Sequence, residues 1–342
     1  MTAVTGARPE ELWFTRCPVP TATGIAADLG RLTAEFAPDG ITVRSLQDVP
    51  DAVAGDTHYT HALPGLFREG GNVPALWARS RGEATRLIGL TWIEERQAIL
   101  VRADSDIDTA AKLRGRRLAV PVHDIAIDFW RAMALRGFAG ALSLAGAALA
   151  DATLVDVPAP RGSGQWEAEL AALGRGDVDA VYAKGALAVE AARRHGVVVA
   201  VDLDAVADRR VRVNNGTPRP ITVHRDLIEH HPDLVARFLA VLVGAADWAA
   251  DNPAEVARIL GAETGAGSVG VAGAYRDLAH RTLRIDLADD RLELLERQQD
   301  FLYEQGFLAT PVDVRAWADP APLRAARLLP SAAIPPLEAP HA

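Results

Sequence analysis

Short runs of aliphatic and branched residues alternate with amphipathic stretches through the middle of the chain. Five runs have the length and composition of buried strands: residues 86–93, 97–102, 117–122, 178–183 and 197–203. The stretches between them, such as residues 125–135 and 165–173, carry apolar positions at helical spacing. This alternation predicts an α/β fold with mostly parallel sheets.

The last third of the chain predicts helices. Apolar residues recur at four-residue spacing through residues 231–250, and Pro232 stands where the first helical residue would be. Residues 289–305 form a second amphipathic pattern, with acidic residues at its start and Gly306 just after its end. We therefore expect helices to complete the domain that the chain begins.

The order of elements fits two lobes joined by crossings of the chain. We expect the first lobe to comprise residues 1–115 and 222–342, and the second lobe residues 116–221. The phrase Leu113-Arg114-Gly115-Arg116-Arg117 resembles the start of the second lobe in type-II periplasmic binding proteins. The resemblance implies a two-lobed fold of that type with its site in the cleft between the lobes, and it leaves the ligand open.

Composition narrows the class of protein. The 342 residues carry a net charge of −9, which offers no basic surface to nucleic acid. Cys17 is the single cysteine, so an intrachain disulfide and a multi-cysteine metal site are excluded. No apolar run is long enough to span a membrane, and the first residues lack the order of a secretory signal. We expect a cytoplasmic protein that does not bind membranes.

Cys17 is the first candidate for chemistry. Pro18 and Pro20 impose an extended or turning path, which places the thiol at the end of a short strand. A lone cysteine is most often a small buried apolar residue. A reactive role is the alternative, because Arg16 is adjacent and a nearby cation favours the thiolate.

His58 and His61 stand three residues apart. Two histidines without a third ligand are a weak indication of zinc, and we assign no metal. His58 has a second interpretation, as the hydrogen-bond partner of Cys17 in a cysteine–histidine pair. Sequence spacing cannot decide between them.

Arg68 is followed by Glu69, Gly70 and Gly71. A guanidinium beside backbone N–H groups that a ligand can approach suits an oxyanion such as phosphate or sulfinate. A surface turn with a solvated arginine is the alternative. The glycines match neither a P-loop nor a dinucleotide-binding fingerprint.

Taken together, the three segments resemble the active-site segments of the 2′-hydroxybiphenyl-2-sulfinate desulfinase family in order and spacing. They are Cys17-Pro18-Val19-Pro20, Thr57-His58-Tyr59-Thr60 and Arg68-Glu69-Gly70-Gly71. The likeness continues through residues 85–91, 97–107, 176–182 and 294–302. It covers nearly the whole chain and is patchy in the second lobe.

The resemblance implies an enzyme that cleaves an aryl carbon–sulfur bond without metal or organic cofactor and releases sulfite. Cys17 would be the catalytic acid or nucleophile, His58 its hydrogen-bond partner, and Arg68 and Gly71, with Gly70 beside them, the sulfinate site. The substrate would be a small aromatic sulfinate supplied by an upstream sulfur-oxidising monooxygenase. Two steps stay open: protonation of the ring carbon by the thiol, or attack of the thiolate on sulfur.

Departures from the family pattern predict an altered pocket. Leu63 stands where the family has a glutamine near the substrate, and Lys184 stands where an aromatic lining would suit a biphenyl. Lys184 is either a contact for an anionic group or a solvated lysine. The alternative function is a solute-binding protein of the sulfonate or thiamine-precursor type, which shares the fold and needs no thiol.

Overall fold

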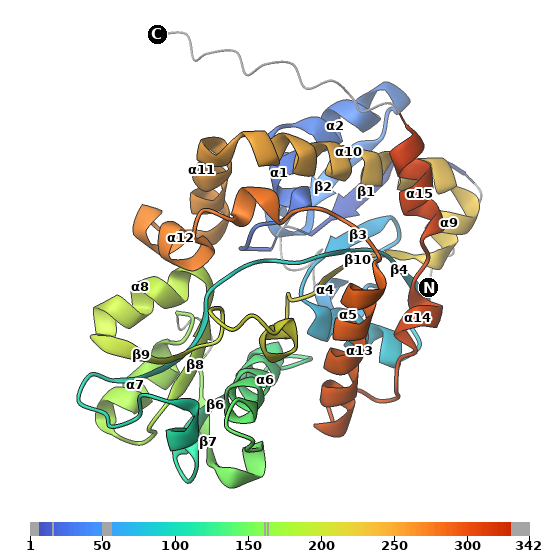
Figure 1. Cartoon of the computed structure of the whole chain (residues 1–342). Coiled ribbons are helices and arrows are strands. Elements are labelled where there is room, and N and C mark those ends of the chain that lie inside the picture. The colour runs from blue at the N-terminus through green and yellow to red at the C-terminus, as the bar shows by residue number, and fades with distance from the viewer. Residues whose placement is uncertain (1–6, 16, 50–56, 161, 163, 330–342) are drawn as a thin grey trace, which may run out of the picture.

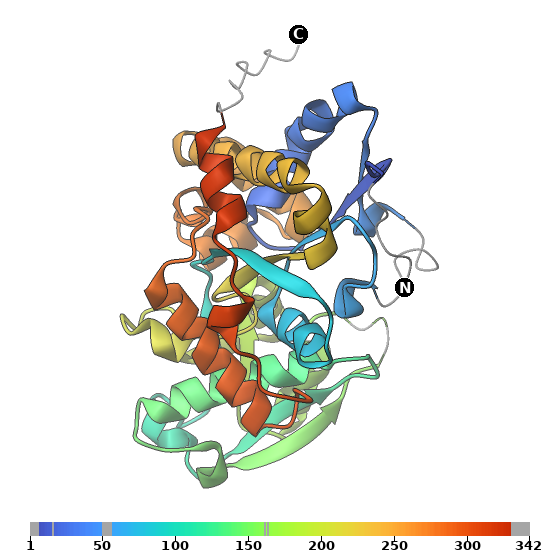
Figure 2. The ribbon, with the colours of Figure 1, turned by 90° about the vertical axis from the view of Figure 1, so that its right-hand side faces the viewer.

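The structure, a computed structural model, describes residues 7–15, 17–49, 57–160, 162 and 164–329. Its strands form two groups, one above the other, each covered by helices (Figures 1 and 2). The strands are β1 (Glu11–Phe14), β2 (Thr42–Ser45), β3 (Leu66–Glu69), β4 (Thr85–Thr91), β5 (Gln97–Arg102), β6 (Arg117–Val122), β7 (Thr153–Pro158), β8 (Val181–Lys184), β9 (Val197–Asp202) and β10 (Arg219–His224).

The helices lie mostly after the strands that they cover. They are α1 (Ala22–Asp28), α2 (Arg31–Phe36), α4 (Thr57–Thr60), α5 (Asn72–Ser80), α6 (Phe129–Ser143), α7 (Glu167–Arg175), α8 (Gly185–His195), α9 (Arg225–His230), α10 (Pro232–Asp251), α11 (Pro253–Thr264), α12 (Ser268–Tyr275), α13 (Asp289–Glu304), α14 (Val314–Trp317) and α15 (Ala321–Leu328). The predicted alternation of strands and helices is confirmed.

The first lobe is built on a five-stranded sheet with the order β2-β1-β3-β10-β4. Strand β1 runs parallel to both β2 and β3, so the carboxyl ends of β1 and β3 lie together at one edge. Helix α10 packs on this sheet, and the ring of Phe238 stacks on that of Phe67 with centroids 3.8 Å apart. This packing fixes the position of β3.

The second lobe holds the sheet β8-β5-β9 and the parallel pair β6-β7, which a bridge from Leu118 to Ala180 connects to the segment before β8. Helix α6 packs against this sheet through Gly137, where a Cβ atom would lie 2.0 Å from the ring of Tyr182. The Tyr182 hydroxyl donates to Gln97 Oε1 at 2.9 Å and accepts from Asn214 Nδ2 at 2.9 Å. Close packing and buried hydrogen bonds thus hold helix and sheet together.

The strands of each lobe run mostly parallel, as predicted, with one antiparallel strand in each. Strand β10 runs antiparallel to β3 and β4, and β5 runs antiparallel to β8 and β9. These are the two strands that enter a lobe after the chain crosses from the other. Composition does not reveal their direction, because a strand's neighbours depend on the path of the chain.

The strand pairing also differs from the expected division of the chain. Residues 97–102, which the sequence placed in the first lobe, form β5 and pair with β8 and β9 of the second. On this pairing we propose that the first crossing lies between β4 and β5, and the return between β9 and β10. Glu94 in the first crossing accepts from Arg212 in the second at 2.5 Å, so the crossings run side by side.

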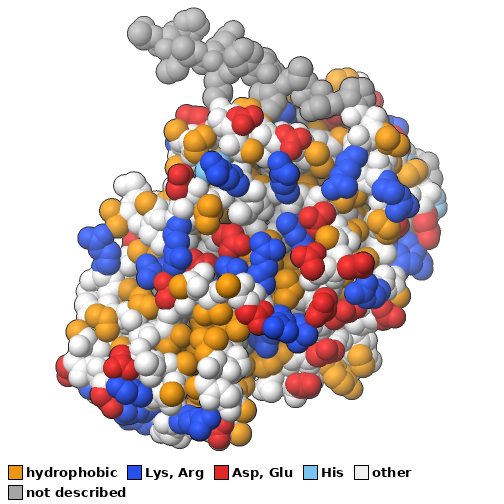
Figure 3. Space-filling model, in the orientation of Figure 1, with side chains coloured by type: hydrophobic (Ala, Val, Ile, Leu, Met, Phe, Trp, Pro, Cys, Tyr) orange, Lys and Arg blue, Asp and Glu red, His pale blue; other side chains and the backbone are white. Residues whose placement is uncertain are grey.

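The helices of the last third agree with prediction. Helix α10 begins at Pro232, and α13 ends at Glu304, two residues before Gly306, whose φ of +76° suits a glycine stop. None of the helices in the described ranges is long and apolar enough to cross a membrane. On the face seen in Figure 3, acidic and basic side chains are interspersed.

Two glycine substitutions test the packing of the second lobe. Gly137→Ala places a methyl group against the Tyr182 ring and is expected to destabilise the protein by about 1–3 kcal/mol. Gly174→Ala, on an exposed position of α7 with open space around it, is expected to stabilise by about 0.5–1 kcal/mol. Urea midpoints measure both changes. Equal midpoints for the two variants would contradict the close contact at Gly137.

Candidate functional site

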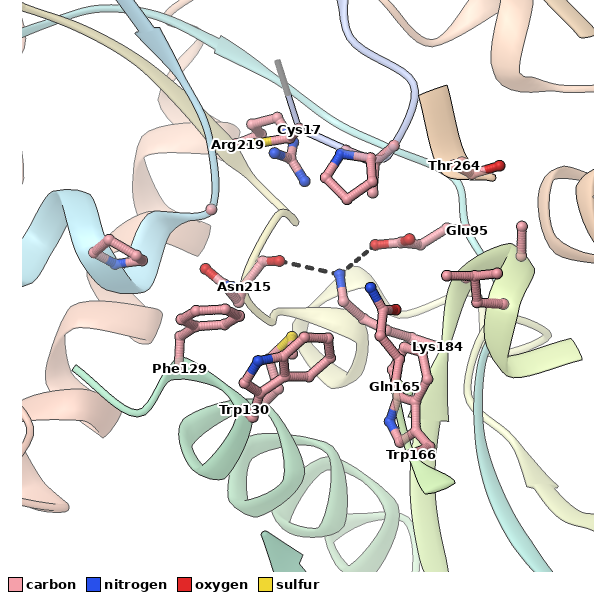
Figure 4. A pocket seen from close by; sticks show the side chains of 18 of the residues that line it. Cys17, Glu95, Phe129, Trp130, Gln165, Trp166, Lys184, Asn215, Arg219 and Thr264 are labelled. Carbon is pink, nitrogen blue, oxygen red and sulfur yellow. Dashed lines mark hydrogen bonds and ion pairs between the residues drawn. The ribbon is translucent and has the colours of Figure 1, made fainter. Parts of the chain in front are cut away.

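A cavity of about 300 Å³ lies between the lobes, and residues of both lobes line it (Figure 4). Cys17, His58, Arg68 and Gly71 come from the first lobe, and Lys184 comes from the second. Five residues singled out from the sequence therefore share one cavity, although up to 167 residues of chain separate them.

Arg68 is fixed by the backbone around it. The residue is 1% exposed at the end of β3. Its Nε donates to the carbonyl oxygen of His58 at 2.9 Å and its Nη1 to that of Gly71 at 3.0 Å. Its Nη2 has no hydrogen-bond partner among the described residues. The alternative of a solvated arginine in a surface turn is wrong.

Burial dominates the electrostatics of Arg68. Loss of solvent lowers the pKa of its guanidinium to about 10, and the positive charge of Arg219 lowers it further, while Cys17 opposes the shift. The group is still a cation near neutral pH. A buried cation with a free N–H group can bind an anion strongly.

The two glycines after Arg68 have different environments. A Cβ atom on Gly70 would lie 2.6 Å from the Arg68 guanidinium, and one on Gly71 would lie 2.2 Å from Asn215 Oδ1. The Gly70 N–H donates to the Pro220 carbonyl at 3.3 Å, so it is not free for a ligand. Gly70 gives Arg68 its space, and Gly71 is the glycine that lines the cavity.

Cys17 lies three residues after β1, beside the end of β3. It is 8% exposed, and its Sγ donates to the carbonyl oxygen of Glu69 at 3.5 Å. The thiol and Arg68 meet because β1 and β3 are parallel and end at the same edge. Arg16, which the sequence offered as the neighbouring cation, lies outside the described residues.

His58 lies on α4 and lines the same cavity as the thiol. Burial, followed by the charges of Arg68 and Arg219, lowers the pKa of its imidazole to about 3, so the ring is neutral. In the described part of the chain, the hydrogen bond of the thiol goes to Glu69 rather than to this ring. The expected cysteine–histidine hydrogen bond is thus not formed in this geometry.

His61 turns away from His58. Its backbone has a φ of +58°, and its Nε2 lies 3.1 Å from Thr222 Oγ1 in the interior of the first lobe. Burial also lowers its pKa to about 3. Across the ranges that the structure describes, no group of three or more His, Cys, Asp or Glu residues is arranged to hold a metal ion.

Lys184 is 8% exposed and paired. Its Nζ donates to Glu95 Oε1 at 2.5 Å and to the Asn215 carbonyl at 3.0 Å, as the dashed lines of Figure 4 mark. The alternative of a solvated lysine is wrong. Leu63 does not line the cavity: it packs against Trp13, Leu46 and Leu66, because the turn at His61 directs it to another side of the sheet.

Sequence reasoning missed the aromatic wall of the cavity. Phe129 and Trp130 at the start of α6, with ring centroids 5.1 Å apart, lie beside Trp166, which meets Trp130 edge-on at 5.4 Å. Figure 4 shows these rings across the cavity from Cys17. The adjacent aromatic pair at residues 129–130 was the available signal. Arg219, Glu95 and Asn215 were also missed as lining residues.

Comparison with known proteins agrees with this geometry. The chain is 30% identical to the 2′-hydroxybiphenyl-2-sulfinate desulfinase of Rhodococcus erythropolis, over 91% of this chain and 92% of that protein, and to that of Rhodococcus qingshengii at the same identity and coverage. A crystal structure of a DszB mutant in complex with biphenyl-2-sulfinic acid superposes with a TM-score of 0.74 at 29% identity, covering 93% and 98% of the two chains.

A wider group shares the fold. The aliphatic sulphonate binding protein SsuA from Escherichia coli superposes with a TM-score of 0.69 at 18% identity, over 91% of this chain and 92% of that one. These neighbours confirm the two-lobed fold of periplasmic binding proteins. The model of the NMT1/THI5-like family matches residues 72–256, which is more than half of the chain. The chain therefore belongs to the NMT1/THI5-like family and, by a match over 91% of its length, to the family of 2′-hydroxybiphenyl-2-sulfinate desulfinases.

Proposed function

We propose that the protein is a desulfinase that cleaves the carbon–sulfur bond of an aryl sulfinate and releases sulfite. The observation that carries the proposal is the free Nη2 of the buried Arg68, which shares one cavity with Cys17 and His58. The relatives at 30% identity support an enzyme that acts on carbon–sulfur bonds. The aromatic rings across the cavity supply an apolar surface for an aryl group.

The sulfinate binds at the end of β3. Arg68 Nη2 donates to one sulfinate oxygen, and the backbone N–H of Gly71, at the start of α5, donates to the other. Arg68 keeps its orientation without the ligand because its Nε and Nη1 are held by backbone carbonyls. The site is therefore ordered before the substrate arrives, which lowers the entropic cost of binding.

Cys17 acts as the acid. Its Sγ lies 3.5 Å from the carbonyl oxygen of Glu69, an acceptor that suits a thiol and would repel a thiolate. The thiol transfers its proton to the ring carbon that bears sulfur, and the electron pair of the carbon–sulfur bond restores the aromatic ring as sulfur dioxide leaves. Water converts sulfur dioxide to bisulfite, and its released proton returns to Cys17. No aryl carbanion forms on this route.

His58 acts as a neutral imidazole. With its pKa near 3, the ring cannot form a thiolate–imidazolium pair with Cys17 near neutral pH. A neutral ring can accept a hydrogen bond from the thiol or from the water that reacts with sulfur dioxide. This role agrees with an acid mechanism, and it needs no metal or organic cofactor.

The chemistry of the proposed substrate indicates which reaction must produce it. An aryl sulfinate arises by oxidation of sulfur in an aromatic compound, so we propose a sulfur-oxidising monooxygenase as the upstream enzyme. We also propose that the reaction takes place in the cytoplasm. The alternative, a solute-binding protein without turnover, shares the fold with SsuA but leaves the thiol in the cavity without a role.

The thiol is tested by Cys17→Ser. We expect sulfite release from biphenyl-2-sulfinate to fall by about 100-fold or more, because serine is a much weaker acid. Thr15→Ser is the control, since Thr15 Oγ1 donates to the same Glu69 carbonyl at 3.3 Å and should keep its activity. Full activity of Cys17→Ser would remove the thiol from the mechanism. Binding of sulfinate without turnover by the unmodified protein would favour a binding protein.

The sulfinate contact is tested by Arg68→Lys. The lysine keeps the charge but loses the planar fork, so we expect kcat/KM for sulfite release to fall by roughly 100-fold, mainly through KM. Arg79→Lys, on the exterior of α5, is the matched control. An unchanged KM in Arg68→Lys would place the sulfinate elsewhere.

The two buried histidines give the protein a defined dependence on pH. His58 and His61 have pKa values near 3 when folded and near 6.5 when unfolded, so the unfolded state binds more protons between these limits. Their contribution to stability is complete above pH 6.5 and is lost as pH falls toward 3. Urea midpoints measured across this range should fall, and less steeply in His58→Gln. The same slope in that variant would contradict a neutral, buried His58.

A further inference from the structure

Arg219 is a second buried arginine in the cavity, and two of its donor nitrogens have no partner among the described residues. It is the first residue of β10 and is 3% exposed. Its Nε and Nη1 are buried without a hydrogen-bond partner in the described part of the chain, and no ion pair joins it to a described carboxylate. Figure 4 shows its guanidinium directed into the cavity below Cys17. An unpartnered buried guanidinium is costly unless a ligand completes it.

The surroundings of Arg219 keep its guanidinium free. Gly216 has a φ of +127°, and a Cβ atom there would lie 2.8 Å from Arg219 Nη2 and 3.4 Å from Lys184 Nζ. A Cβ atom at this position would therefore come too close to the Arg219 guanidinium and would touch Lys184 Nζ. Glu95, the carboxylate on the cavity wall, is bound to Lys184. Arg219 therefore lies beside the ion pair of Lys184 and Glu95, whose charges already neutralise each other.

The charges on the described cavity wall are unbalanced. Arg68, Arg219 and Lys184 are three cations, and Glu95 is the one carboxylate that faces them. Glu69 follows Arg68 on β3 and points to the opposite side of the sheet, where it accepts from Thr23 and Thr91. With the thiol protonated, a sulfinate supplies one negative charge and leaves one cation without a counterion.

We propose that Arg219 binds a second anionic group of the substrate, a carboxylate, so that the substrate is an aryl sulfinate that carries a carboxylate on its ring system. This inference rests on the proposed function. A guanidinium offers two parallel N–H donors along an edge, which match the two oxygens of a carboxylate. Arg68 holds the sulfinate, Arg219 holds the carboxylate, and the rings of Phe129, Trp130 and Trp166 face the aryl group between them.

Binding of unreactive analogues tests the proposal without turnover. Benzenesulfonate and the ortho, meta and para isomers of sulfobenzoate are titrated into the full-length protein by calorimetry. At least one sulfobenzoate is expected to bind about tenfold or more tightly than benzenesulfonate. In Arg219→Gln this ratio is expected to fall to near one. Arg210→Gln, which removes an exposed arginine paired with Asp208, should keep the ratio.

Three outcomes would overturn the proposal. Equal affinity of the unmodified protein for benzenesulfonate and every sulfobenzoate would show that no carboxylate site exists. An equal loss for both ligand classes in Arg219→Gln would place Arg219 on the sulfur group beside Arg68. A preference for hydroxybenzenesulfonate over the sulfobenzoates would assign the site to a phenol.

Measurements of sulfite release distinguish the proposed carboxylate site from the proposed desulfinase activity. Sulfite release from the matching sulfinobenzoate should exceed that from benzenesulfinate, and Arg219→Gln should lower kcat/KM at least tenfold more for the carboxylated substrate. Tight, Arg219-dependent binding of a sulfobenzoate with no sulfite release from any sulfinate would support the carboxylate site and reject the desulfinase. Sulfite release with no carboxylate preference would reject the site alone.

Discussion

The cavity depends on one pair of neighbouring residues at the end of β3. Because successive residues of a strand point to opposite faces, Arg68 enters the cavity while Glu69 enters the interior of the first lobe. Arg68 holds the backbone of α4 and the start of α5. Glu69 accepts from the backbone N–H of Thr23 in α1 at 2.9 Å and from Thr91 on β4 at 3.1 Å. Two charged side chains thus fix the elements that carry His58 and Gly71 and the helix that follows Cys17.

The two lobes contribute different chemistry to the cavity. The first lobe supplies the thiol, the neutral imidazole and the arginines, and the second supplies the aromatic wall and Lys184. This division follows from the fold, because the crossings between β4 and β5 and between β9 and β10 run side by side and bring both lobes to one cleft. The proposed reaction needs both an anion site and an apolar surface, and the cleft brings the arginines of the first lobe opposite the aromatic rings of the second.

The sequence predicted those site residues that stand out because of their immediate neighbours in the chain. Cys17 could be placed at a strand end because Pro18 and Pro20 follow it, and Arg68 stood out because two glycines follow it. The sequence could not show that Arg68 and Lys184 are buried, because the same residue spacing is also compatible with solvated side chains. The partner of the thiol was also beyond prediction, since Glu69 offers its backbone oxygen, which every residue has.

The residues that were missed share a cause. Arg219, Phe129 and Trp166 reach the cavity only because the chain returns to the first lobe at β10 and because α6 and α7 begin at the cleft. A sequence without its topology gives no reason to place Arg219 near Arg68, 151 residues earlier. The same topology explains why Leu63 failed as a substrate contact, since the left-handed turn at His61 removes it from the cavity wall.

The charge of the cavity distinguishes this protein from a simple anion-binding site. A binding protein needs cations that match its ligand, and the described wall of this cavity has such cations in Arg68 and Arg219. It also has the thiol of Cys17 and the imidazole of His58, which burial keeps neutral, so that this ring adds no charge to attract an anion. Groups that contribute little to binding a charged ligand, yet lie beside its reacting bond, are those that a reaction requires. The placement of the Cys17 thiol and the His58 ring beside Arg68 in one cavity therefore favours chemistry in the cleft.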